Sequence, residues 1–181
     1  LTNLRQFNRQ LEKLLMDGFP LPFSLGVTEN MHRPTEYCLF LTGASILLPD
    51  TTYYQPEQKE SHDSLLSLYG NMVKQLFAYT DLSAEEQEQY LKDTFAFDEL
   101  LAKYVKSQVE WSEYVKCFNP MSLNAVCRQI APVKFRRLLT KIYGEKLPES
   151  IMVAEPRYFK NFKAILNETT YPLYQHWAYV R

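Results

Sequence analysis

Glycine is scarce in this chain, with five residues among 181. An all-β fold with many tight turns uses more glycine, and a phosphate-binding loop needs a glycine-rich stretch that this sequence lacks. Long hydrophobic runs are missing as well, so no segment of the sequence is predicted to span a membrane. Because 46% of the residues are hydrophobic, the chain can nevertheless bury a substantial core.

Cysteine is also rare and loosely spaced, at Cys38, Cys117 and Cys127. An odd count at these spacings predicts neither a disulfide framework nor a Cys-x-x-Cys metal site. A reducing compartment fits this pattern best. The sequence starts at Leu1 without a visible signal peptide, which says little if the chain is a piece of a longer protein.

The net charge of −1 hides an uneven distribution. Residues 55–100 carry ten acids and three lysines, whereas residues 128–163 carry nine bases and three acids. We interpret these as helical faces that complement each other or a missing neighbour. A nucleic-acid patch is the alternative, but no RNA- or DNA-binding motif accompanies the charge, so we expect no nucleic-acid partner.

Hydrophobic spacing predicts a mainly α fold. Helices are expected over residues 2–17, 60–79, 84–108 and 133–143, with shorter ones starting at 122, 156 and 170. Local signals mark many of their ends: Thr2 as a cap, a Ser83–Glu86 capping box, stops at Gly18 and Gly144, and helix starts at Pro156 and Pro172.

Two short strands, Phe23–Val27 and Tyr37–Leu41, are expected to form a hairpin-like excursion near residues 23–41. Ser150–Ala154 is a further extended segment. The predicted architecture is therefore one multi-helix domain over residues 1–181 with a short two-stranded β excursion.

The last predicted helix is aromatic and stops abruptly. It carries Tyr171, Tyr174, Trp177 and Tyr179, and no stop signal precedes Arg181. We expect the chain to be cut from something longer, with exposed apolar surface that a missing domain covers.

No self-contained active site is visible in the sequence. The three histidines, His32, His62 and His176, are never four residues apart, so the His-Glu-x-x-His zinc motif is absent. A distant assembly of the three is less expected than lone surface or capping roles, and His176 beside Trp177 is expected to pack. We assign no catalytic and no metal-binding residue.

Two nucleophile candidates and an acidic cluster also favour structural roles. Gly43–Leu47 begins like a serine hydrolase elbow around Ser45 but lacks the second glycine. A thiol–imidazole pair of Cys38 and His32 is conceivable, yet Cys38 lies in an apolar run typical of a small buried hydrophobe. Glu85, Glu86 and Glu88, at the start of a helix, are expected to be a solvated first turn.

Four segments, in order, resemble the N-terminal region of the neprilysin and endothelin-converting-enzyme family, and most closely the bacterial oligoendopeptidase O type. They are Leu48–Tyr54, similar to Leu-Pro-x-x-x-Tyr-Tyr; Phe118–Leu123, similar to aromatic-Asn-x-Met-Thr-Leu; Pro156–Phe159, like Pro-x-Tyr-hydrophobic; and Leu173–Trp177. The resemblance covers residues 27–181.

This resemblance implies two mainly helical lobes around a closed cavity. One lobe carries His-Glu-x-x-His and a further Glu, and there a zinc-bound water attacks the peptide bond; the other limits entry to small peptides. This chain looks like much of the second lobe, so zinc is expected in the parent protein only and the catalytic domain is expected to pack against this one. No zinc ligand carries over, and the arginine that binds the substrate carboxylate falls upstream of Leu1.

One departure bears on localisation. Secreted animal members have cysteines around the Tyr-Tyr loop, where this chain has Gln55–Glu57. That difference favours a cytoplasmic bacterial protein, with a secreted or surface-associated form left open.

Three functions remain open at this point. The first is the cavity-forming lobe of a zinc metalloendopeptidase that hydrolyses small peptides, with its substrate-binding residues unknown. The second is a stand-alone helical interaction module without enzymatic activity. The third, carried only by the basic stretch, is an RNA-binding helical protein.

Overall fold

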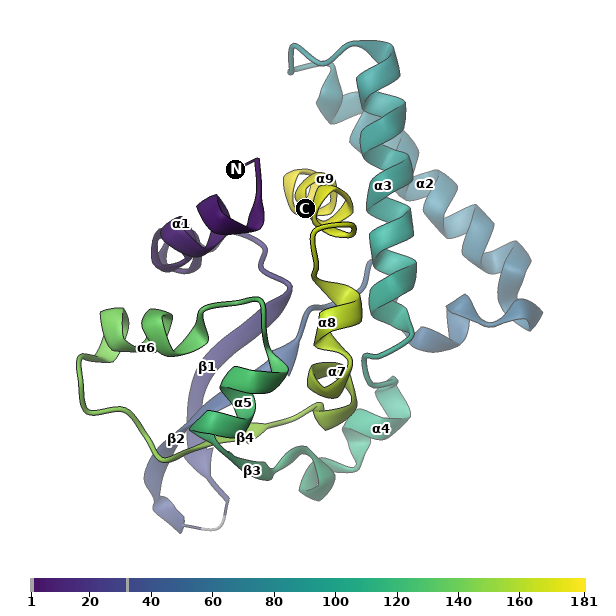
Figure 1. Ribbon diagram of the computed structural model, residues 1–181. Coiled ribbons are helices and arrows are strands. Elements are labelled where there is room, and N and C mark those ends of the chain that lie inside the picture. The colour runs from purple at the N-terminus through teal and green to yellow at the C-terminus, as the bar shows by residue number, and fades with distance from the viewer. Residues whose placement is uncertain (1, 32) are drawn as a thin grey trace.

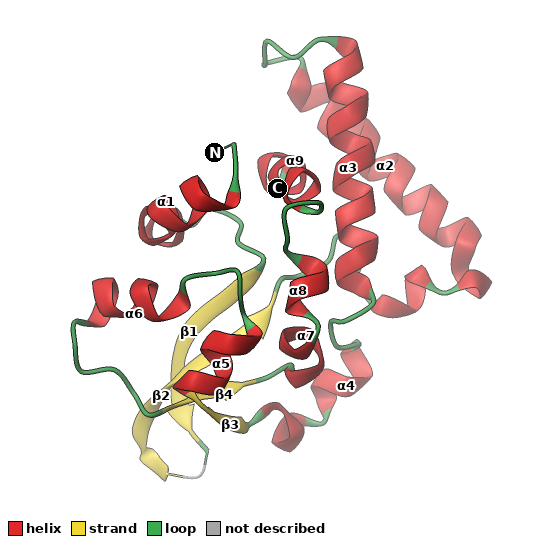
Figure 2. Ribbon diagram, in the orientation of Figure 1, coloured by secondary structure: helices red, strands yellow, loops and turns green. Residues whose placement is uncertain are grey.

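The computed structural model describes residues 2–31 and 33–181 and confirms a mainly helical chain with a small sheet (Figures 1 and 2). Its α-helices are α1 Leu4–Met16, α2 Lys59–Phe77, α3 Ala84–Ala102, α4 Gln108–Ser112, α5 Leu123–Gln129, α6 Phe135–Tyr143, α7 Pro156–Lys160, α8 Phe162–Ile165 and α9 Tyr171–Val180. Short 3-10 helices are η1 Thr51–Tyr54, η2 Pro56–Gln58 and η3 Tyr114–Cys117.

The sheet has four strands in the order β1-β2-β4-β3, namely β1 Phe23–Asn30, β2 Arg33–Gly43, β4 Ser150–Val153 and β3 Asn119–Ser122. β1 and β2 form the expected hairpin, with Phe23 opposite Gly43, and both strands are longer than predicted. β4 lies parallel to β2, and β3 pairs antiparallel with β4. The β part is therefore a sheet rather than an isolated excursion, because two strands far away in the sequence complete it.

Local sequence signals set several helix ends as predicted. Ser83 accepts a hydrogen bond from the Glu86 amide and Glu86 reaches back to the Ser83 amide, forming the capping box of α3. Gly18 and Gly144 take positive φ angles of 71° and 76° just beyond α1 and α6. At the start of α1, Asn3 rather than Thr2 is the cap.

The helix expected over residues 84–108 ends earlier, at Ala102. Ser107 begins a separate short helix, α4, with its own capping box to Glu110. The intervening Lys106 amide donates to the Glu155 carboxylate at 2.8 Å instead of to a helix carbonyl. A long-range hydrogen bond thus holds the chain in a turn where periodicity alone predicts a continuing helix.

The aromatic C-terminal helix lies inside the molecule. α9 packs between α1 and α3 (Figure 1), with Phe7 of α1 edge-on to Tyr174 and with Phe97 of α3 edge-on to Trp177. Tyr174 and Trp177 are buried, while Tyr179 is half exposed. Apart from Tyr179, the large aromatic side chains of this helix do not contribute to the exposed apolar surface predicted for the chain, because α1 and α3 cover them.

Candidate functional site

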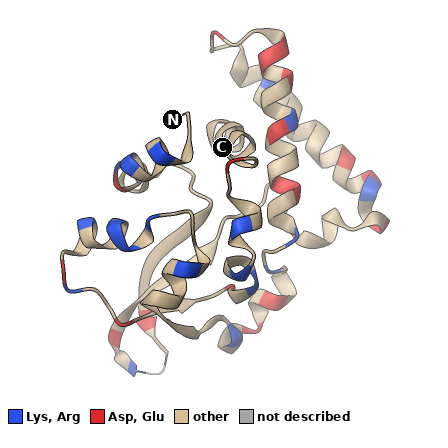
Figure 3. Ribbon diagram, viewed as in Figure 1, with Lys and Arg blue, Asp and Glu red and all other residues tan. Residues whose placement is uncertain are grey.

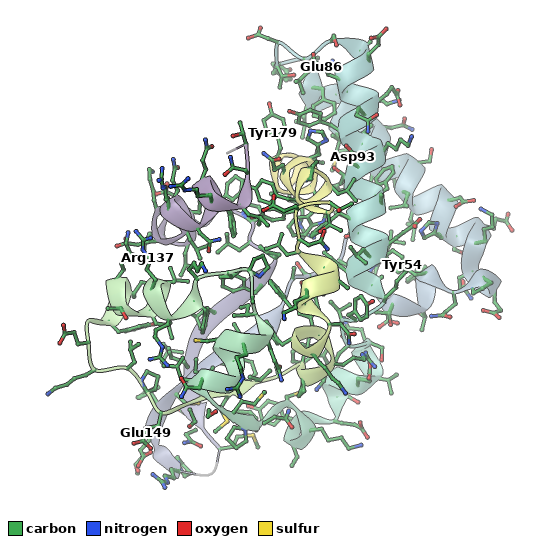
Figure 4. The ribbon with its side chains drawn as sticks, viewed as in Figure 1. Tyr54, Glu86, Asp93, Arg137, Glu149 and Tyr179 are labelled. Carbon is green, nitrogen blue, oxygen red and sulfur yellow. The ribbon has the colours of Figure 1, made fainter. Side chains whose placement is uncertain are left out.

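The segment that follows β2, residues 44–54, contains the Leu-Pro-x-x-x-Tyr-Tyr stretch and is tied to α3 and α9 by one buried carboxylate. Asp98 lies in α3, buried, and its Oδ1 accepts hydrogen bonds from the Leu47 amide at 2.9 Å and from Trp177 Nε1 at 3.3 Å. Its Oδ2 accepts the hydroxyl proton of Tyr54, which lies beside α3 (Figure 4). One side chain thereby joins the loop, α3 and α9.

A second buried carboxylate, Glu155, anchors the start of the same segment. It directly precedes α7, and its two oxygens accept backbone hydrogen bonds from Gly43 at 2.7 Å and from Lys106 at 2.8 Å. Next to it, Arg157 donates two hydrogen bonds to Glu110 and one to the Val105 carbonyl. The end of β2, the α3–α4 turn and α7 are therefore clamped together.

A cavity of about 250 Å³ lies between these anchored segments. The polar or aromatic side chains that line it include Ser45, Asp50, Lys106, Gln108, Trp111 and Glu155. The Asp50 carboxylate caps η1 through the Thr52 amide and also accepts from the Gln108 amide at 2.5 Å. Because these carboxylates are engaged with backbone donors of the chain itself, the hollow is a structural junction.

Burial raises the pKa of the Asp98 and Glu155 carboxyl groups above their ordinary values, and the hydrogen bonds that each accepts oppose this shift. Burial and the neighbouring Asp98 also raise the pKa of the Tyr54 hydroxyl, which therefore stays protonated and donates. Raised carboxyl pKa values are common at catalytic acids. Here the oxygens of both carboxylates are already occupied, which favours a positioning role.

Comparison with known proteins settles the family. The N-terminal profile described as peptidase family M13 matches residues 2–181. A neutral endopeptidase of Lactobacillus helveticus is 31% identical over 182 residues, and one of Lactococcus lactis subsp. cremoris is 26% identical over 178. The chain belongs to peptidase family M13.

Solved structures agree with this M13 fold. PEPO from Lactobacillus rhamnosis HN001 superposes with a TM-score of 0.89 at 26% identity over 99% of the chain. The Mycobacterium tuberculosis zinc metalloprotease ZMP1 in its open state shares the fold, with a TM-score of 0.79 at 18% identity over 96% of the chain. This M13 chain spans 27–28% of the length of these relatives.

The described residues of this M13 chain hold no side-chain cluster that fits a zinc ion. Across residues 2–31 and 33–181, no three His, Cys, Asp or Glu side chains gather as a ligand set. His62 Nδ1 contacts Asp63 at 2.9 Å, and His176 Nδ1 contacts Asp93 at 2.7 Å while its ring stacks on Tyr90. His176 packs as expected, and His32 lies outside the described residues.

The two sequence-level nucleophile candidates have other partners. Ser45 accepts a hydrogen bond on Oγ from Arg181 at 2.9 Å, and the same guanidinium donates to the Ser45 carbonyl at 2.6 Å. Cys38 is partly buried and packs, as Phe40 does, against the apolar cluster that contains Phe118 and Met152, and burial raises the pKa of its thiol. A raised pKa disfavours the reactive thiolate, so both residues behave as structural groups.

The charged segments do not pair with each other. Figure 3 shows Lys and Arg on α1, α5, α6 and α8, whereas Asp and Glu predominate on α2 and α3. Within the part of the chain that the structure describes, no ion pair joins residues 55–100 to residues 128–163. The idea that the two faces complement each other was wrong, and a neighbour outside this chain remains the open half of that prediction.

Asp98 and Glu155 are the residues that sequence reasoning missed. Asp98 is one of ten acids in residues 55–100, and nothing in the local pattern separates it from the solvated ones. Glu155 precedes Pro156, where a helix starts, and this local position does not indicate that its carboxylate binds distant backbone amides. Their donors lie 49 to 112 residues away, apart from Tyr54 at 44.

No helix among the described residues is long and apolar enough to cross a bilayer.

Proposed function

We propose that this chain is a non-catalytic part of a zinc metalloendopeptidase that cleaves small peptides, and that it helps to enclose the cavity and limit substrate size. The observation that carries the proposal is the match to peptidase family M13 over residues 2–181, together with the PEPO fold over 99% of the chain. The relatives named as neutral endopeptidases are more than three times as long, which leaves ample polypeptide for the chemistry.

The anchored segment after β2 supports a scaffolding role. Asp98 and Glu155 fix residues 43–54 against α3, α7 and α9 through hydrogen bonds that leave no free carboxylate to act on a substrate. A cavity wall must hold its shape while peptides enter and leave. Buried, fully satisfied polar networks provide that rigidity.

The parent protein's partners follow from the same proposal. They are peptide substrates, zinc bound by residues outside this chain, and the catalytic domain packed against this one. The bacterial cytoplasm remains the proposed location.

The test compares the parent protein with residues 1–181 under the same zinc-supplemented conditions. We expect the parent to hydrolyse short peptides, to leave an unfolded protein such as casein intact, and to lose activity with a chelator. Residues 1–181 alone should show no zinc-dependent turnover. Clear turnover by residues 1–181 would contradict the non-catalytic role, and casein cleavage by the parent would contradict the size limit.

A further inference from the structure

Helix α2 carries large apolar side chains on two of its faces. On the inner face Leu66, Val73 and Phe77 are buried, and a Cβ at Gly70 would lie 3.5 Å from the Phe95 ring of α3. The outer face consists of Leu68, Met72 and Leu76, and Tyr79 follows in the turn just after the helix ends at Phe77; their exposed fractions are 69, 50, 57 and 90%.

The outer face of α2 is a continuous stripe. Leu68, Met72 and Leu76 are spaced four residues apart, which places them along one side of the helix. The helical part of the stripe, from Leu68 to Leu76, is about 12 Å long, or roughly two helical turns. It therefore has the dimensions of a helix–helix contact, in which two axes lie about 8–10 Å apart.

Charge is depleted along the same stretch. From Ser64 to Tyr79 the only charged residue is Lys74, which pairs with Glu88 of α3. A helix face that meets only water ordinarily carries charged residues, whereas the centre of a permanent interface is apolar and poor in charge. The outer face of α2 has the composition of a buried surface.

The buried cluster beneath α2 is small. Val73, Phe77 and Leu91 form a buried cluster of their own, separate from the main core around the sheet, α1 and α9. The main contacts of α2 are with α3 and the η1–η2 turns, and α2 lies on the side of α3 away from the sheet (Figure 1). The exposed apolar side chains of α2 lie on the other side of the helix from this cluster.

We infer that the outer face of α2 is covered by an apolar helix of the parent polypeptide from outside residues 1–181. This inference rests on the proposed function, because it takes the chain to be part of a longer M13 peptidase. The chain spans about 28% of the length of its relatives. Because residues 55–100 carry a net charge of −7 (ten acids, three lysines), the covering helix should bear Lys or Arg along its rim.

The experiment uses the full-length parent protein. A photo-cross-linking amino acid, p-benzoylphenylalanine, is placed at position 76 or, as a control, at position 67, where the native Ser67 is exposed on α2 outside the stripe. Cross-linked peptides are identified by mass spectrometry, and peptide hydrolysis by each variant is measured in parallel.

We expect position 76 to yield intramolecular cross-links to a helix outside residues 1–181 with basic residues on its rim, and position 67 to yield none to that helix. Cross-links confined to residues 1–181, or no cross-links at all, would overturn the inference, and so would cross-links to a second copy. If the variants still hydrolyse peptides in that case, the proposed function stands while the inference fails. If the unmodified parent protein does not hydrolyse peptides, the proposed function itself is contradicted.

Discussion

Helices α9 and α2 both carry large apolar side chains, but those of α9 are mostly buried within the chain whereas several of those of α2 are exposed. α9 is the more aromatic, yet Tyr171, Tyr174 and Trp177 are buried between α1 and α3. The sequence of α2 is that of an ordinary amphipathic helix, yet large apolar side chains on its outer face are exposed. Apolar composition shows that a helix needs cover, but not which neighbour supplies it. For α9 the cover lies within this chain, and for α2 we place it outside.

The largest effect should separate these two helices directly. Trp177→Ala removes a buried indole and its hydrogen bond to Asp98. We expect it to lower the free energy of unfolding by about 3–5 kcal/mol. The matched aromatic change in the α2 region, Tyr79→Ala, removes a side chain that is 90% exposed and should cost less than about 0.5 kcal/mol in residues 1–181. Urea denaturation of both variants measures the difference, and equal losses would break the comparison.

A second change tests the clamp that holds the α9 side of the molecule together. In Glu155→Gln, one carboxylate oxygen becomes an amide that faces the N–H of Gly43 or Lys106. Because both groups are then donors, one buried N–H is left without an acceptor. This should lower the free energy of unfolding by about 1–3 kcal/mol.

Asp98→Asn is the matched control for this change. Its new amide can face Tyr54, whose hydroxyl can turn to accept, so a smaller loss is expected. The two midpoints in denaturant give the ranking. A greater loss in Asp98→Asn than in Glu155→Gln would refute the assignment of donors.

Close packing at the end of β2 supplies a third test. A Cβ added at Gly43 would lie 2.9 Å from the Tyr158 ring and 3.0 Å from the Glu155 carboxylate. Gly43→Ala should therefore destabilise the fold by about 1–2 kcal/mol. Gly26→Ala, in β1, meets nothing within 4 Å and should be nearly neutral. Thermal unfolding of the two variants checks this prediction. Similar Tm values would contradict it, because they would show that Tyr158 and Glu155 can move to accept the added methyl group at little cost.

The smallest effect is a pH dependence. Burial raises the pKa of Asp98 above its ordinary 3.8, so the folded chain holds this proton more tightly than the unfolded chain does. The stabilisation from the protonated form is complete below the ordinary value and is lost as pH rises through the raised one.

The side chain at position 98 of the Asp98→Asn variant cannot titrate. As the pH rises from the ordinary pKa of Asp98 through its raised pKa, the free energy of unfolding of the wild type should therefore fall relative to that of the variant. Denaturation of both proteins at a series of pH values isolates the contribution of Asp98. A pH-independent difference would contradict the raised pKa.

Features that depend on neighbouring residues were predictable from the sequence. The Ser83–Glu86 box, the turn at Gly18 and the start of α7 at Pro156 need only residues within one helical turn. The Ser107–Glu110 box that starts α4 carries the same kind of signal and could have corrected the end of α3.

Features that depend on distant partners were not predictable. Strand β3 forms because Asn119–Ser122 pairs with β4, about thirty residues later, and its Pro120 argues against a strand when read alone. The roles of Asp98 and Glu155 likewise depend on donors from separate elements. The family resemblance led to the proposed function because it compares several segments and their order at once. The lack of a recognisable site among the residues does not indicate any function.

In the proposed function, residues 1–181 shape the parent enzyme and take no part in its metal chemistry. The most direct test replaces His32, His62 and His176 with Gln in the full-length parent and measures its zinc content and peptide turnover. We predict that zinc content stays at the wild-type level and that turnover persists. Loss of zinc from a parent that remains folded would contradict the account.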